Sequence, residues 1–115
     1  MANTFKVVTK AGVTSADVIY TAGSGVTAIV LGLILGNTTT SQITSTVTLS
    51  SDTSSRAGAN DEANQAVELI TDAPIPAGSS LELLSGNKVV LETTDTISVT
   101  GCGATDVALS IMEIT

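Results

Sequence analysis

The side chains that could carry chemistry in this sequence are few, and the first of them is its single thiol, Cys102. A nucleophilic cysteine needs a neighbouring cation or a helix N-terminus to stabilise its thiolate, and no cation adjoins the Gly101-Cys102-Gly103 turn in the sequence. The chain has no histidine, which excludes Ser-His-Asp and Cys-His catalysis. We therefore predict that Cys102 is a small structural residue and that the protein is not an enzyme.

Carboxylates could serve acid–base catalysis or metal binding. Asp95 and Asp106 could act as a general acid and base, but both flank turns, where aspartate routinely accepts backbone N–H bonds. Asn60, Asp61 and Glu62 could offer oxygen ligands to Ca²⁺, but the spacing of an EF-hand loop is absent. One thiol without imidazoles cannot hold zinc. We expect no metal and no cofactor.

Charge and hydropathy limit the partners. The 115 residues include four Lys or Arg and eleven Asp or Glu, for a net charge of −7, and the aromatic side chains are Phe5 and Tyr20. So few cations and stacking rings exclude nucleic acid as a partner. The longest apolar run, residues 26–35, is far short of the roughly 20 residues that span a bilayer, and the first residues lack the basic start of a signal peptide. We expect a protein made in the cytoplasm with no membrane partner.

Apolar residues recur at every second position through most of the chain, which predicts strands with one buried face. In residues 42–50, Ile43, Val47 and Leu49 share one parity while threonines occupy the other. The same alternation recurs in residues 80–84, 88–92, 96–100 and 106–110, and a further strand is expected near 17–21. From residue 111 the parity blurs, which indicates either a bulge or a strand end that is covered on both faces.

The run at residues 28–35 is apolar on both parities. Two interpretations remain open: a fully buried central strand, or a strand with one face on the core and the other on a second copy of the chain. Under the second, the candidate self-association residues are Ile29, Leu31, Leu33 and Leu35, and we expect a homotrimer.

Turn and loop residues divide these segments. Ser85-Gly86-Asn87 predicts a hairpin, and Pro74 and Pro76 predict an edge or corner. Residues 51–65 are polar and form a long loop, in which the candidate partner contacts are Arg56, Asn60, Asp61 and Glu62. Residues 61–70 fit either a strand at about 65–71, which we favour, or a short helix capped by Asn60. Together these features predict an all-β fold: a single β-sandwich or jelly roll of about eight short antiparallel strands over residues 1–115.

Four segments, which together cover nearly the whole chain, carry a family resemblance: residues 73–81 (APIPAGSSL), residues 88–99 with their hairpin-like LETTDTISV, the closing residues 106–113, and the early stretch 11–39. With them the chain resembles the small Thr/Ser-rich virion structural proteins of tailed bacteriophages, in particular those of marine cyanophages. The resemblance implies a non-enzymatic virion component, a capsid decoration or cement protein that contacts the major capsid protein. The alternative it leaves open is a tail, baseplate or fibre component that binds a host surface or carbohydrate.

Overall fold

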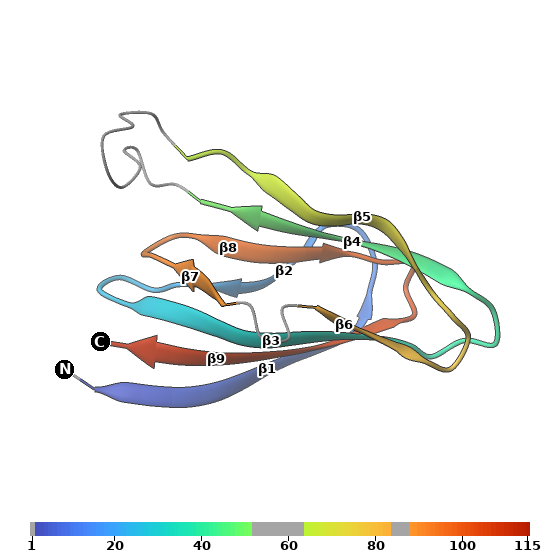
Figure 1. Ribbon diagram of the computed structural model, residues 1–115, viewed down its shortest axis with the longest axis horizontal. Helices are drawn as coiled ribbons and strands as arrows, with labels where there is room; N and C mark the ends of the chain where they lie inside the picture. The colour runs from blue at the N-terminus through green and yellow to red at the C-terminus, as the bar shows by residue number, and fades with distance from the viewer. Residues whose placement is uncertain (1, 52–63, 84–87) are drawn as a thin grey trace.

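Nine strands in two antiparallel sheets make up the computed structural model, which describes residues 2–51, 64–83 and 88–115 (Figure 1). Sheet A has the order β1 (Asn3–Val13), β9 (Thr105–Ile114), β3 (Thr27–Asn37) and β6 (Ser80–Leu83), and β7 (Val89–Leu91) also pairs with β3. Sheet B has the order β2 (Asp17–Thr21), β8 (Thr96–Thr100), β4 (Ile43–Ser50) and β5 (Val67–Ile75). Within these three ranges there is no helix, and hence none that could cross a membrane.

The strand order is that of a jelly roll. Strands β6 and β7 pair with different parts of β3, at residues 33–36 and 28–30, so together they fill one position of sheet A. Each sheet then has four positions, and every connection except β4–β5 and β6–β7 passes from one sheet to the other. Two four-stranded sheets wound together in this way are the double-sheet jelly roll, which confirms the predicted fold class.

The predicted hairpin around Ser85-Gly86-Asn87 is wrong. A hairpin would pair β6 with β7, whereas both strands run antiparallel to β3 and lie in line along its edge. Residues 84–87 themselves lie outside the described residues. The partner of both β6 and β7 is therefore the distant strand β3. The alternating pattern of each short segment fits pairing with β3 as well as pairing in a hairpin.

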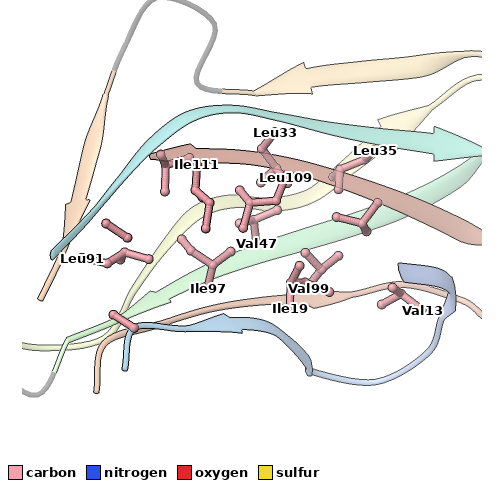
Figure 2. Close-up of a cluster of buried hydrophobic side chains, with 14 of the residues drawn as sticks. Val13, Ile19, Leu33, Leu35, Val47, Leu91, Ile97, Val99, Leu109 and Ile111 are labelled. Atoms are coloured by element: carbon pink, nitrogen blue, oxygen red, sulfur yellow. The ribbon is translucent and has the colours of Figure 1, made fainter. Parts of the chain in front are cut away.

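The core lies between the sheets and is aliphatic. Leu109 and Ile111 of sheet A face Val47, Ile97 and Val99 of sheet B, and all five side chains are fully buried (Figure 2). Each such side chain stabilises the fold by roughly 1.5–3 kcal/mol relative to an exposed one. The inward parity predicted for β4, β8 and β9 is confirmed.

A bulge in β3 divides its apolar run. Ala28 and Val30 are buried, and after the bulge the buried residues are Leu33 and Leu35, on the opposite parity. The register with β9 shifts between Val30 and Gly32, which leaves Leu31 as the extra residue. The prediction that Leu33 and Leu35 face a second copy is therefore wrong, because both point into the core of their own subunit (Figure 2).

Strand β5 settles two further predictions. It runs from Val67 to Ile75, so the strand interpretation of this region is confirmed over the helical one for its described residues. It is also an edge of sheet B, as Pro74 predicts, since proline cannot donate to a second neighbouring strand. Its pairing with β4 shifts register twice, and Asp72 adopts a left-handed backbone conformation with φ of 47°.

Candidate interaction surface

The residues singled out for their chemistry are dispersed over the fold. Cys102 is free and exposed. Asp95 is buried in the β7–β8 connection, where its Oδ2 accepts the Glu92 backbone N–H at 3.0 Å. Asp106 accepts the Gly12 backbone N–H at 3.1 Å. Asp95 thus has the expected turn role, whereas Asp106 lies inside β9 and binds the backbone of β1 at its irregularity between Lys10 and Val13.

Metal-ligating side chains do not gather in the described ranges: no group of three His, Cys, Asp or Glu is found there. The four residues proposed as partner contacts, Arg56, Asn60, Asp61 and Glu62, lie outside the described residues. The most prominent surface feature of the described chain is apolar, and it lies on the side of sheet A that faces away from sheet B.

One row of apolar side chains crosses this outward side. Phe5 pairs with Met112, Met112 with Ile29, and Ile29 with Val90, so the row runs across β1, β9, β3 and β7. Their parity is opposite to that of the buried Leu91, Val30 and Ile111, which turns all four outward. The next row holds Val7 with Ser110 and Gly32, and the row after it holds Ile34 with Ala108. Together with Val7 and Ile34, the four residues form a surface that we call the outer apolar face.

The outer apolar face is well exposed. Phe5 keeps 72% of its surface in contact with solvent, Val7 64%, Val90 55% and Ile34 45%, while Ile29 and Met112 are half-buried. Single exposed apolar residues are ordinary, but a contiguous group of them marks an interaction site in a soluble protein. By contrast, Val18 and Val67 are separate exposed valines on sheet B.

Charged residues border the outer apolar face without entering it. Glu82 pairs with Ile34 at the β6 edge, and Asp106 lies near the far end of β9. Between β1, β9 and β3, the small residues Gly36 and Ala108 leave a shallow depression of about 380 Å³ beside Ile34. Lys10 and Asp106 both line this depression, so charged residues of both signs lie at the end of sheet A away from the chain termini, whose place Figure 1 shows.

A polar cluster lies at the same end, on the inner side of β1. The Lys6 Nζ lies 2.7 Å from Glu113 Oε1, and the Tyr20 hydroxyl donates to Glu113 Oε2 at 2.6 Å. These residues belong to β1, β9 and β2, so the cluster links sheet A to sheet B. Lys6 holds the pKa of Glu113 below its usual value, with help from the Tyr20 hydroxyl. Burial, reinforced by the adjacent carboxylate, raises the pKa of Tyr20.

The sequence prediction found part of this surface. Ile29 belongs to the outer apolar face, and Leu31 is half-buried at the bulge; whether they contact a second copy stays a prediction. Phe5, Val7 and Val90 were missed. The loss of alternation after residue 111 was the signal in the sequence for this face. The β1–β9 register has no bulge there, so the apolar Met112 points outward.

Comparison with known proteins yields little. No family model matches the chain, and no curated protein matches it. A solved structure described as "Bacillus endospore appendages form a novel family of disulfide-linked pili" is similar to it, with 16% sequence identity and a TM-score of 0.44, over 97% of this chain and 83% of that chain. A likeness at this level says nothing about function.

Proposed function

We propose that the protein is a non-enzymatic structural subunit that works in many copies, as a decoration protein of a bacteriophage head. The observation that carries the structural role is the outer apolar face, because an exposed contiguous apolar group on a sheet is stabilised when another protein surface covers it. The virion setting rests on the resemblance of residues 73–81, 88–99 and 106–113 to phage structural proteins.

Self-association and shell binding reinforce each other in this proposal. A subunit that assembles, as a trimer in the form predicted from the sequence, presents several weak contacts to a lattice at once, and linked contacts bind far more tightly than single ones. The net charge of −7 keeps the free subunit in solution and favours a basic patch on the shell.

A matched pair of valines tests the role of the face. Val90 lies on the outer apolar face with 55% of its surface exposed, and Val18 lies on β2 of sheet B with 56% exposed. Because both side chains are largely in solvent, Val90→Lys and Val18→Lys should leave the thermal midpoint almost unchanged. Sedimentation velocity should show weakened self-association for Val90→Lys alone. Equal assembly of both variants and the wild type would contradict the proposed role of the face.

Binding to phage heads tests the proposed role as a decoration protein. The purified protein is mixed with expanded, undecorated heads, and bound protein is quantified after sedimentation. We expect saturable binding at a fixed ratio to the major capsid protein, reduced by Val90→Lys and unchanged by Val18→Lys. Binding to tails, baseplates or fibres in place of heads would refute the decoration role.

A further inference from the structure

The open edge of sheet A at β1 differs from the other sheet edges in the described structure. Asn3 to Lys10 pair with β9 without a register shift. The opposite edge of sheet A is divided between the short β6 and β7, and on sheet B, β2 has five residues and a register shift. Strand β5 carries Pro74 and two shifts. Bulges, prolines and short strands protect edges against pairing, and β1 has none of these between residues 3 and 10; its protection there consists of Lys6 and Lys10, since lysines on an edge also oppose pairing.

The hydrogen-bonding groups that face this open edge can be assigned from the register. Ala2 and Thr115 exchange two backbone hydrogen bonds, of 3.1 and 3.0 Å, so they form a hydrogen-bonded pair. Such pairs alternate along an antiparallel ladder, which makes Thr4, Lys6 and Val8 hydrogen-bonded to β9. The N–H and C=O groups of the intervening residues, Asn3, Phe5, Val7 and Thr9, therefore point away from β9 towards the open edge.

From this pattern we infer that β1 pairs antiparallel with β1 of a second copy, about a two-fold axis at Val7. The inference rests on the proposed multi-copy role; because the same edge meets itself, this contact closes a dimer and not the trimer predicted from the sequence. Since β1 is the long regular edge among the described strands, the edge that best matches it is another β1. Pairing of β1 with β1 of a second copy satisfies the outward N–H and C=O groups of both strands. It also joins sheet A of one copy to sheet A of the other as one continuous sheet.

Charge selects the register. The groups facing the edge allow the two-fold axis to pass through Phe5, Lys6, Val7 or Val8. An axis at Lys6 places the two copies of that lysine opposite each other, and an axis at Val8 places Lys6 opposite Lys10 of the second copy. Like charges directly opposite are destabilising, although the ion pair of each Lys6 with Glu113 of its own subunit reduces the repulsion. An axis at Phe5 pairs residues 3–7 alone, because the strand begins at Asn3.

An axis at Val7 has neither defect. It places Lys6 opposite Val8 and Lys10 opposite Thr4 of the second copy, and it pairs residues 3–11. The regular part of the strand alone, from Thr4 to Lys10, would gain about six hydrogen bonds in this register. It also sets Phe5 and Val7 beside the second copy, so that the outer apolar faces of both subunits become continuous.

The variant Val7→Pro tests the edge contact without disturbing the fold of the subunit. The Val7 N–H makes no bond to β9, so Val7→Pro is compatible with an edge strand and should keep the wild-type thermal midpoint. In the paired edge it removes the two central hydrogen bonds, which should weaken association about tenfold or more. The control, Val7→Thr, keeps the N–H and the strand propensity and should associate more tightly than Val7→Pro.

A disulfide reports the register independently of affinity. In a Cys102→Ser background, Val7→Cys places two thiols on the two-fold axis, within the Cα separation that a disulfide spans, and should form covalent dimers on mild oxidation. Asn3→Cys in the same background lies opposite residue 11 of the second copy and should not. Crosslinking of Asn3→Cys in preference to Val7→Cys would overturn the register.

The outcomes distinguish this inference from the proposed function. If the wild type assembles and Val7→Pro assembles equally well, the edge contact is refuted, while the proposed function stands provided that Val90→Lys weakens assembly. If the wild type is a monomer at every concentration, both fail. Weakened assembly of Val7→Pro together with crosslinking of Val7→Cys supports the two-fold edge.

Discussion

Asn37 should be the polar side chain on which the fold depends most. It ends β3, is 4% exposed, and its Nδ2 donates to the backbone carbonyl oxygens of Ser41, Ile75 and Pro76 at 2.7, 2.9 and 3.1 Å. Its Oδ1 accepts the backbone N–H and the hydroxyl of Thr39 at 2.8 and 2.7 Å. The amide therefore fastens the end of β3 to the end of β5, where the chain passes from sheet B to sheet A.

The contacts of Asn37 determine how much free energy of unfolding its substitution should remove. Asn37→Ala removes two N–H donors, each worth about 1 kcal/mol net, and leaves the buried Ile75 carbonyl without this partner at a further 1–3 kcal/mol, so we expect a loss of about 3–5 kcal/mol. That is a large part of the roughly 5–15 kcal/mol that stabilises a domain. Asn37→Asp should lose still more at pH 7, because a carboxylate oxygen would face three carbonyl oxygens.

Urea denaturation followed by circular dichroism measures the effect as a fall in the midpoint at constant slope. Thr39→Ala is the control: it removes a hydroxyl partner of the same amide at the surface and should lose less than about 1.5 kcal/mol. The reasoning would be refuted if Asn37→Ala stayed within about 0.5 kcal/mol of the wild type, or if Asn37→Asp were the more stable of the two variants at pH 7.

Three further predictions concern the core, a tight turn and pH. Leu109→Asp should abolish folding because it buries an unpaired charge, and a wild-type thermal midpoint would show that this face of β9 is not inward. Gly101→Ala should destabilise the protein by calorimetry, since an added Cβ would lie 2.7 Å from the backbone oxygen of Val13; an unchanged midpoint would contradict this crowding. Lys6 lowers the folded-state pKa of Glu113, so stability should be retained above the ordinary value of 4.5 and decline as the pH falls below it; Glu113→Gln should flatten that part of the pH profile.

The sequence predicts the layers of this fold well because side-chain alternation is a local property. The inward residues of β4, of β8 and of β9 as far as Ser110 could be predicted directly, since the other parity there is threonine, serine or another small or polar residue. In β3 both parities are apolar, so alternation cannot show the bulge at Leu31 that exchanges the inward and outward sets; the sign in the sequence is Gly32, which interrupts the apolar run beside it. That is why Leu33 and Leu35 were assigned to the wrong face.

Pairing partners were beyond the sequence for a different reason. The segments that became β6 and β7 are each short and alternating, and a Gly-Asn connection between them suits a hairpin. Their actual partner, β3, lies about fifty residues away, and only the global strand order selects it. The outer apolar face has the same origin: Phe5, Met112, Ile29 and Val90 become neighbours through pairing of β1, β9, β3 and β7.

Sedimentation equilibrium of the wild type across a wide concentration range measures directly whether copies of the chain assemble. We expect assembly that strengthens with concentration, and also with salt, because salt screens the repulsion between subunits that each carry a net charge of −7. A monomer mass of 11.5 kDa at every concentration and ionic strength would contradict the account, since the outer apolar face and the open edge of β1 would then both lack a second copy to cover them.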